Sequence, residues 1–375
     1  MSTHRLRIGF VGDLSFSFLR RSQSHVGDIS DNWNAIRRAI GEYDLLVGNL
    51  ECYVVNSWCS EKTRRQSMAV LGDAIKPFLD AMDFSVLGLA NNHSIDGGKE
   101  GLEATLGRLA SLQIHTFGAG HTAAEAEKTT FVEVNGRKIA FVGACDDREH
   151  YARADFRGIA PLVSQRLGSR VRNATSQADV VIVVIHADLE FSEVPGRWRR
   201  RLSRRLVEQG AHMVIQHHPH VLQGIEVHEG GLIAYSLGNF VFPIEGNRYQ
   251  ERHAGVRNTM VLVTDVTFGD GAPEIHYRIV PARIGDDHFP KLLTGSEATN
   301  AMQDFSRLTS ILEDKNSYRV AWLRRCRQEA VARARSIYYA FAKGQYARGI
   351  LEIWAILSRQ QDRRWVVGLL SIGYV

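Results

Sequence analysis

Three histidines fall within four residues of the sequence, at His217, His218 and His220, and Pro219 separates the last two. They follow a short apolar run at residues 212–215, which predicts a strand that carries them at its carboxyl end. Two imidazoles spaced by one residue can reach the same cation or two adjacent cations. This spacing therefore favours a metal-binding role over a purely structural one.

Carboxylate, carboxamide and imidazole groups follow other apolar runs in the same way. They are Asp13 after 7–11, Asn49 and Glu51 after 44–47, Asn91, Asn92 and His93 after 84–89, His186 and Glu190 after 179–185, and Asn239 after 232–235. In open α/β sheets the carboxyl ends of the strands lie along one edge, where ligands bind. We therefore expect these groups to meet in one crevice, although they lie far apart in the sequence.

Taken alone, most of these residues also have an ordinary structural explanation. The alternatives are a helix cap at Asp13, a surface acid at Glu51, a turn residue at Asn92 and a core histidine at His186. Asp96 comes three residues after His93, where it can hold the second nitrogen of that ring or cap the helix that follows. Only their joint placement at strand ends favours a site.

The elements that position these residues alternate between short apolar runs and amphipathic helical stretches up to about residue 285. We predict strands at 7–11, 44–47, 84–89, 138–142, 179–185, 212–215 and 232–235, and helices at 32–40, 74–82, 98–112, 164–176 and 198–209. The runs are nearly continuous in Val, Ile and Leu, as in strands that are buried on both faces. Alternating patterns at 259–268 and 274–284, separated by a Gly-Asp-Gly turn, predict an antiparallel hairpin.

The composition is that of a folded globular protein. The 375 residues are 44% hydrophobic and 23% charged, which excludes a largely disordered chain. Four scattered cysteines exclude a disulfide scaffold and fit a reducing compartment. The longest apolar run, at 180–185, is far shorter than the roughly 20 residues of a membrane-spanning helix, and the first residues lack a secretory signal. We therefore expect a cytoplasmic protein.

The positive charge is concentrated near the C-terminal end of the sequence. Residues 320–375 hold ten Lys and Arg against three Asp and Glu, a balance of +7 within a total of +5. This tail, with the apolar stretch 365–370 beside Arg363 and Arg364, could lie on the inner face of the membrane or pack onto the body. Six arginines between 197 and 205 lie on a predicted amphipathic helix, whose charged face we expect to meet water. A near-neutral body with a solvated arginine face argues against nucleic acid as the partner.

The motifs, in their order, closely resemble the CapA-like capsule and poly-γ-glutamate synthesis family, a branch of the calcineurin-like metallophosphoesterase superfamily. The matching segments are residues 12–13, 49–51, 91–93 with Asp96 and Gly98, His186 with Glu190, 217–221 with Gln223, and 236–240. The resemblance implies an α/β fold, a four-layer α/β/β/α sandwich of the metallophosphoesterase type over residues 1–290. A basic, mainly helical extension over 291–375 would follow it.

The resemblance also implies roles for individual residues. Asp13 and His220 would bind one ion, Asn92, His186 and His218 the other, with Glu51 bridging the two. His93, oriented by Asp96, would be the general acid or a contact on the phosphate side of the substrate, and we expect substrate contacts from His217, Glu190 and Asn239. Nitrogen and carboxylate ligands without a thiolate suit one or two divalent ions of Mn²⁺, Fe²⁺ or Zn²⁺ better than Ca²⁺. Three positions depart from the pattern, with Ser15 where the superfamily has histidine, Asp188 where a small residue is usual, and Gln216 where a glycine usually precedes the histidine cluster.

The expected function is a metal-dependent, hydrolase-like step of bacterial capsule or exopolymer biosynthesis, on poly-γ-glutamate or polysaccharide. A metal-bound hydroxide would attack a phosphoester or amide bond in an anionic polymer or in a phosphorylated or γ-glutamyl substrate. One alternative is a non-catalytic assembly factor that docks to a membrane-associated capsule synthesis complex through the basic tail. Another is a nuclease or a metal-dependent peptide-modifying enzyme of the same superfamily.

Overall fold

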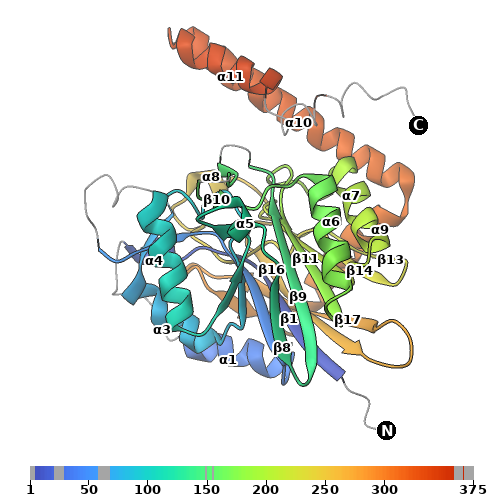
Figure 1. Ribbon diagram of the computed structural model, residues 1–375. Helices are drawn as coiled ribbons and strands as arrows, with labels where there is room; N and C mark the ends of the chain where they lie inside the picture. The colour runs from blue at the N-terminus through green and yellow to red at the C-terminus, as the bar shows by residue number, and fades with distance from the viewer. Residues whose placement is uncertain are drawn as a thin grey trace.

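The computed structural model describes residues 5–20, 29–57, 68–147, 150–153 and 156–358, together with Val366. Within these residues the chain builds two mixed β-sheets that pack face to face (Figure 1). Helices cover the outer face of each sheet, so the prediction of an α/β protein with C-terminal helices is confirmed.

The first sheet has the strand order β18-β17-β16-β1-β2-β5-β6, and β15 pairs with the carboxyl end of β1. Its strands are β1 (Arg5–Leu14), β2 (Leu45–Leu50), β5 (Val86–Gly88), β6 (His115–Phe117), β15 (Asn239–Val241), β16 (Asn258–Thr267), β17 (Glu274–Ile284) and β18 (Pro290–Leu292). Five strands of this sheet pair in parallel with one another, namely β1, β2, β5, β6 and β15. Strands β16 and β17 form the predicted antiparallel hairpin.

The second sheet has the order β13-β14-β12-β11-β9-β8. Its strands are β8 (Thr130–Val134), β9 (Arg137–Cys145), β11 (Val180–His186), β12 (Met213–His217), β13 (Ile225–His228) and β14 (Gly231–Ala234). The four strands β9, β11, β12 and β14 are parallel. Two short pairs, β3 (Tyr53–Val55) with β4 (Ala69–Leu71) and β7 (Ala119–Gly120) with β10 (Gly158–Ile159), lie outside the two large sheets.

Strand β11 shows why the apolar runs are continuous. Val181, Val183 and Ile185 pack under helices, whereas Ile182 and Val184 face the core between the two sheets. Successive side chains of a strand point to opposite faces, so a strand that is covered on both faces needs an apolar residue at every position. The strand then ends at His186, the first residue that carries chemistry.

The helices form two outer layers. Helices α1 (Ile29–Ile40), α3 (Gly72–Met82) and α4 (Gly98–Ser111) pack on the first sheet, and α6 (Ser164–Thr175) and α7 (Arg197–Glu208) pack on the second. The remaining helical segments are η1 (Ser17–Arg20), α5 (Ala123–Ala126) and α8 (Arg248–Glu251), followed by α9 (Gly295–Glu313), α10 (Lys315–Ala342) and α11 (Tyr346–Ser358). The predicted domain boundary at residue 290 stays a prediction. The short strand β18 begins at that residue and still pairs with β17 of the first sheet.

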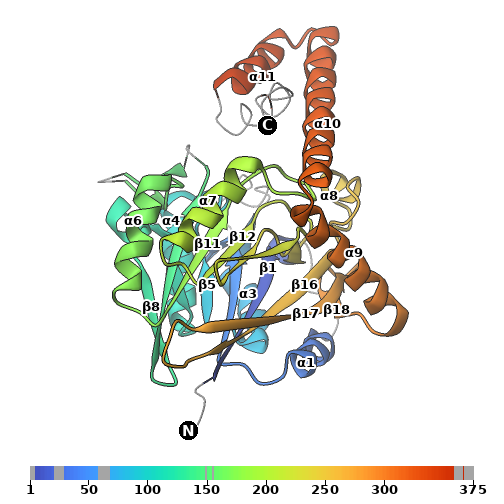
Figure 2. The same cartoon turned by 90° about the vertical axis from the view of Figure 1, so that its right-hand side faces the viewer.

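Helix α10 leaves the body of the protein as an arm, and α11 folds back beside it (Figures 1 and 2). The first turns of α10 are anchored, since Tyr318, Trp322 and Cys326 are buried against the helices that cover the second sheet. Further along, Tyr338 and Tyr339 are exposed. None of the described helices is both long enough and apolar enough to cross a membrane. The predicted membrane-facing stretch 365–370 lies outside the described residues except for Val366.

The prediction that the charged face of the arginine-rich helix α7 meets water is wrong for three of its six arginines. Arg199 is fully buried and forms an ion pair with Asp188, with Nε 3.1 Å from Oδ2. Arg200 and Arg204 both pair with Glu226 of β13. Because a buried guanidinium needs a charged partner and several acceptors, this side of α7 packs on the sheet instead of facing solvent. The other three arginines do face solvent, namely Arg197, Arg201 and Arg205.

Candidate metal centre

The register of the strands brings distant motifs together at the carboxyl ends of both sheets. Asp13 of β1 lies opposite Asn49 of β2 and Asn239 of β15, and His186 of β11 lies opposite His217 of β12. This arrangement depends on Gly12, because a Cβ there would lie 2.1 Å from the carbonyl oxygen of Gly238. The absence of a side chain lets β1 and β15 approach closely enough for the Asp13 amide to donate to that carbonyl at 2.9 Å.

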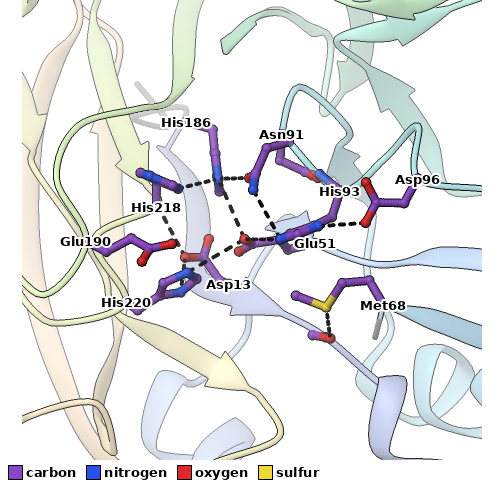
Figure 3. A network of polar contacts seen from close by, with 12 residues as sticks. Asp13, Glu51, Met68, Asn91, His93, Asp96, His186, Glu190, His218 and His220 are labelled. Atoms are coloured by element: carbon purple, nitrogen blue, oxygen red, sulfur yellow. Dashed lines mark hydrogen bonds and ion pairs between the residues drawn. The ribbon is translucent and has the colours of Figure 1, made fainter. Parts of the chain in front are cut away.

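The histidine turn after β12 has an unusual backbone. His218 and His220 both have positive φ angles, of 96° and 58°, as do Asp188 at 100° and Phe191 at 57° in the loop after β11. Residues with a Cβ rarely adopt this region, and such strain tends to persist where the surrounding structure holds a functional geometry. Here it turns the imidazoles of His218 and His220 toward the same point as His186 and Glu51 (Figure 3).

One set of possible ligand atoms gathers around His186. Its Nε2 lies 2.8 Å from Asn92 Oδ1, 3.0 Å from His218 Nδ1 and 3.7 Å from Glu51 Oε1. Metal–ligand bonds of about 2.0–2.1 Å would place neighbouring ligand atoms about 3.0–3.4 Å apart. The Asn92 and His218 separations lie at or just below this range and the Glu51 separation lies just above it, so small side-chain shifts would place these four donors around one cation.

A second set lies beside the first and shares Glu51 with it. Asp13, Glu51 and His220 each offer a ligand atom within 4.8 Å of the other two. His220 Nδ1 donates to Asn239 Oδ1 at 2.8 Å, so in the neutral ring Nε2, which lies 3.8 Å from Glu51 Oε1, is the nitrogen with a free lone pair. The structure thus brings together all six residues that the sequence predicted as ligands, in the two groups that the resemblance implied.

Glu51 is the most informative member of the cluster. Its side chain is 0% exposed, and neither carboxylate oxygen has a hydrogen-bond partner among the described residues. Burial and the nearby Asp13 carboxylate raise the pKa of Glu51 well above its ordinary value. A buried carboxylate without donors is unfavourable unless a cation compensates it, so the chemistry of this donor set fits a divalent metal ion.

The neighbouring groups are already in the protonation states that metal ligands need. Burial opposes ionisation of Asp13, but the imidazoles of His217, His186 and His220 outweigh it and hold the pKa of this carboxyl below its ordinary value. Burial, reinforced by neighbouring imidazoles, lowers the pKa of His186 well below its usual range and also lowers that of His218. At neutral pH these two rings are therefore uncharged and can offer lone pairs.

His93 and Asp96 form a pair at the more open side of the cluster. His93 Nδ1 lies 2.8 Å from Asp96 Oδ2, and the two side chains are 26% and 27% exposed. His93 Nε2 faces inward, 3.1 Å from Asn92 Nδ2 and 4.0 Å from Glu51 Oε1. Asp96 is not the side-chain cap of α4, since that helix begins after Gly97 without a side-chain cap.

The three residues that we expected to contact substrate lie in different places. His217 is 2% exposed, with Nδ1 2.9 Å from Asp13 Oδ1, and Asn239 is fully buried behind His220. Both therefore lie behind the ligand atoms. Glu190 is half-buried, and its Oε2 accepts a hydrogen bond from Tyr249. Asp188 lies away from the cluster in its ion pair with Arg199.

Some residues of the site carried no predicted role. Asn49 Nδ2 contacts both Asp13 Oδ1, at 2.8 Å, and His186 Nδ1, at 3.3 Å, so it links the ligands of the two sheets. Asn91 in turn donates to Asn49 Oδ1 at 3.1 Å. Their place at strand ends was a usable signal. Tyr249 follows no apolar run, and nothing in the sequence pattern pointed to it.

The sequence also matches a known family over most of the described body. Residues 7–244 match the family described as "Bacterial capsule synthesis protein PGA_cap". The chain belongs to this family. The match includes every residue of the candidate metal centre named above except Tyr249, and it ends before the C-terminal helices.

Individual relatives agree with this assignment. The chain is 32% identical over 248 residues to the "PGA biosynthesis protein CapA" of Bacillus subtilis (strain 168), a match that covers 63% of each chain. It is 30% identical over 203 residues to the "Capsule biosynthesis protein CapA" of Bacillus anthracis, covering 51% of this chain and 49% of that protein. The matched regions thus span about half to two thirds of these curated relatives.

Two solved structures from Thermus thermophilus align with parts of the chain at low sequence identity. A hypothetical protein aligns with a TM-score of 0.44 at 17% identity, covering 74% of this chain and 99% of that one. A 5'-nucleotidase precursor aligns with a TM-score of 0.45 at 12% identity, covering 81% and 59%. The family assignment rests on the sequence matches.

Proposed function

We propose that the protein is a metal-dependent hydrolase of capsule or exopolymer biosynthesis that cleaves a phosphoester or amide bond. The observation that carries this proposal is Glu51, a fully buried carboxylate without a hydrogen-bond donor, surrounded by imidazole and carboxylate groups at ligand spacing. Two sheets packed face to face between helical layers support a four-layer sandwich of the metallophosphoesterase type.

The residues that would hold the ions fall into the two groups described above. Asp13 and His220 would hold one ion, and Asn92, His186 and His218 the other, with Glu51 between them. Bound Mn²⁺, Fe²⁺ or Zn²⁺ would acidify water and stabilise negative charge that develops on the bond under attack. Asn239 and His217 would keep His220 and Asp13 in position from behind.

His93 would protonate the leaving group. Its Nδ1–H donates to Asp96 and its Nε2 accepts from Asn92 Nδ2 at 3.1 Å, so the ring would act as an acid at Nε2 when that nitrogen carries the ring's second proton. The Asp96 carboxylate fixes the orientation of the ring, as in other His–carboxylate pairs. The partial exposure of both side chains lets a substrate group reach Nε2.

The names of the relatives suggest the class of substrate. Relatives named for PGA biosynthesis and capsule biosynthesis support an anionic polymer or its precursors, with γ-glutamyl amides and phosphoesters as the bonds to test. Both bond types develop negative charge on oxygen during attack, so the same centre suits either.

Metal content gives the first test. Purified His218→Ala protein should bind the ion at least about tenfold more weakly than wild type, because it loses a neutral ligand. His276→Ala, at an exposed position on β17, should retain wild-type metal content. Unchanged metal content in His218→Ala removes the assignment. A phosphodiester and γ-glutamyl substrate screen of the metal-loaded wild type then tests turnover, and loss of both activities in His218→Ala is expected.

We also propose that the arm formed by α10 and α11 docks on an anionic membrane surface, the role suggested for the basic tail. On α10, Arg324, Arg327 and Arg335 are exposed, together with Val331 and Tyr338 at helical spacing. The exposed apolar side chains of α11 are Tyr346, Ile350, Leu351, Ile353 and Trp354. Arginine beside exposed aromatic and aliphatic groups matches the chemistry of anionic lipid headgroups and the acyl boundary.

Liposome flotation tests the arm. The full chain should float with vesicles that contain anionic lipid and much less with purely zwitterionic vesicles. The triple variant Arg324→Gln, Arg327→Gln and Arg335→Gln should lose most of this binding, whereas the same changes at Arg197, Arg201 and Arg205 on α7 should not. Equal flotation of the two triple variants contradicts a docking role for the arm.

A further inference from the structure

A third carboxylate approaches the histidines of the candidate metal centre from the loop after β11. Glu190, His218 and His220 each offer a ligand atom within 4.8 Å of the other two, the same spacing as in the two groups that contain Glu51. Figure 3 shows the Glu190 side chain reaching toward His218 and His220, with Asp13 between it and Glu51. Glu190 therefore extends the cluster on the side away from Glu51.

The loop that carries Glu190 is fixed to the histidine turn and to the C-terminal arm. The amide of Phe191 donates to the carbonyl of Pro219 at 2.8 Å, which joins this loop to the turn between His218 and His220. Arg325 of α10 donates from Nη2 to the Glu190 carbonyl at 2.8 Å. The position of Glu190 is thus set from both sides.

The carboxylate itself is held at one oxygen. Tyr249 donates its hydroxyl hydrogen to Glu190 Oε2, and this fixes the rotation of the carboxylate. The other oxygen, Oε1, makes no such bond to Tyr249 and can serve as a ligand atom. Outer partners of this kind commonly orient metal-binding carboxylates.

His220 belongs both to the group with Asp13 and Glu51 and to the group with Glu190 and His218, so Glu190 would add a donor where the two groups meet. Ser15, two residues after Asp13, contacts Ser17 Oγ at 3.1 Å and Met68 Sδ at 3.5 Å and does not face the cluster. Among the described residues, the group of Asp13, Glu51 and His220 then offers three protein donors. Two divalent ions beside the carboxylates of Asp13 and Glu51 would also keep a net charge of about +2. The carboxylate of Glu190 would lower this buried positive charge.

We propose that Glu190 is a ligand of the metal centre, on the His218 and His220 side, rather than a residue that contacts substrate. The inference rests on the proposed metal-dependent function and deepens it. It also means that Tyr249 and Arg325, which lie outside the family match at 7–244, support the centre. The C-terminal arm is then joined to the site through the Glu190 loop.

Metal binding by the full chain, measured with Mn²⁺ and Co²⁺ alone, tests this role. Glu190→Gln keeps the size of the side chain and removes its charge, so Mn²⁺ affinity measured by calorimetry should fall by more than about 100-fold, beyond the 10–100-fold cost of an outer partner. The visible absorption spectrum of the Co²⁺-loaded protein should change in position and intensity, because one ligand is lost. Tyr249→Phe should weaken binding by about tenfold or less and leave the spectrum close to wild type.

Glu193→Gln is the matched control, since Glu193 lies in the same loop and pairs with Arg307 at the surface. It should bind like wild type. Wild-type affinity and an unchanged Co²⁺ spectrum in Glu190→Gln overturn the assignment of Glu190, and the proposed function survives if His218→Ala still loses metal. A wild-type protein that binds neither ion overturns both. If Glu190→Gln melts below the temperature of the assay, two other variants replace it. Glu190→Asp keeps the charge on a shorter side chain and should bind Mn²⁺ more tightly than Glu190→Ala. Equal Mn²⁺ affinity of these two variants contradicts the assignment of Glu190 as a ligand.

Discussion

Glu51 offers a sharp prediction because the same carboxylate should destabilise the protein without metal and stabilise it with metal. In the metal-free state both oxygens are buried without donors, and the nearest imidazole nitrogens lie 3.7–4.0 Å away. Replacement by Gln keeps the shape and removes the cost of burying this carboxyl, which without metal must either carry a charge or hold a proton. We therefore expect Glu51→Gln to raise the free energy of unfolding in EDTA by about 1–3 kcal/mol, the usual cost of an unsatisfied buried polar group.

The effect on melting temperature is modest but measurable. At about 2.1 cal/mol/K per residue, a single transition of 375 residues shifts about 1.3 °C per kcal/mol, so Glu51→Gln should melt about 1–4 °C higher in EDTA. With metal at 100 times its Kd, wild type should gain about 2.7 kcal/mol, or about 3.5 °C. The variant should gain little, because it has lost the shared ligand.

Differential scanning calorimetry in EDTA and with Mn²⁺ measures both effects, the higher melting temperature of Glu51→Gln without metal and its smaller gain with metal. Glu133→Gln, at an exposed position on β8, should change neither value. If Glu51→Gln is less stable than wild type in EDTA, Glu51 already makes a favourable contact without metal, and the reasoning from its burial is refuted.

The same contacts lead to three further expected outcomes. Metal affinity should rise with pH, because the raised pKa of Glu51 means that a proton must leave before the ion binds, whereas His186 is already neutral. Calorimetry in buffers of different ionisation enthalpy measures the proton release. A metal affinity that falls as pH rises contradicts this prediction. His93→Gln should keep wild-type metal content and lose about 10²–10⁴ in kcat on whichever substrate is found, and equal losses of metal and rate would show a ligand instead of an acid. Asp188→Ala should lower the free energy of unfolding in urea by about 3–5 kcal/mol, because it leaves Arg199 buried without its ionic partner, and should leave metal affinity unchanged.

The sequence predicted the elements well where burial on both faces leaves a clear pattern. Strand β11 could be read directly, because each of its residues from Val180 to Ile185 is apolar and its first polar group is a ligand candidate. The order of groups at strand ends predicted which residues would meet. Local patterns did not show that these groups come from two sheets, and only the family resemblance implied a second sheet.

The parts that could not be predicted depend on contacts between distant residues. Arg199 lies on the same face of α7 as Leu202, but an arginine gives no sign of burial in the sequence. Its ion pair with Asp188 and its hydrogen bonds to distant carbonyls explain that burial. The positive φ angles of His218 and His220 have no signal in the sequence, since residues with side chains rarely adopt them. Tyr249 reaches Glu190 from 59 residues away along the chain.

Anomalous X-ray scattering from crystals grown with Mn²⁺ tests the central claim most directly. The account predicts one or two strong peaks within about 2.5 Å of the Glu51 carboxylate, with His218, His186, Asp13 and His220 as further ligands. Peaks only at the exposed group of Glu208, His228 and Glu229, or no peak beside Glu51 at saturating Mn²⁺, would contradict it.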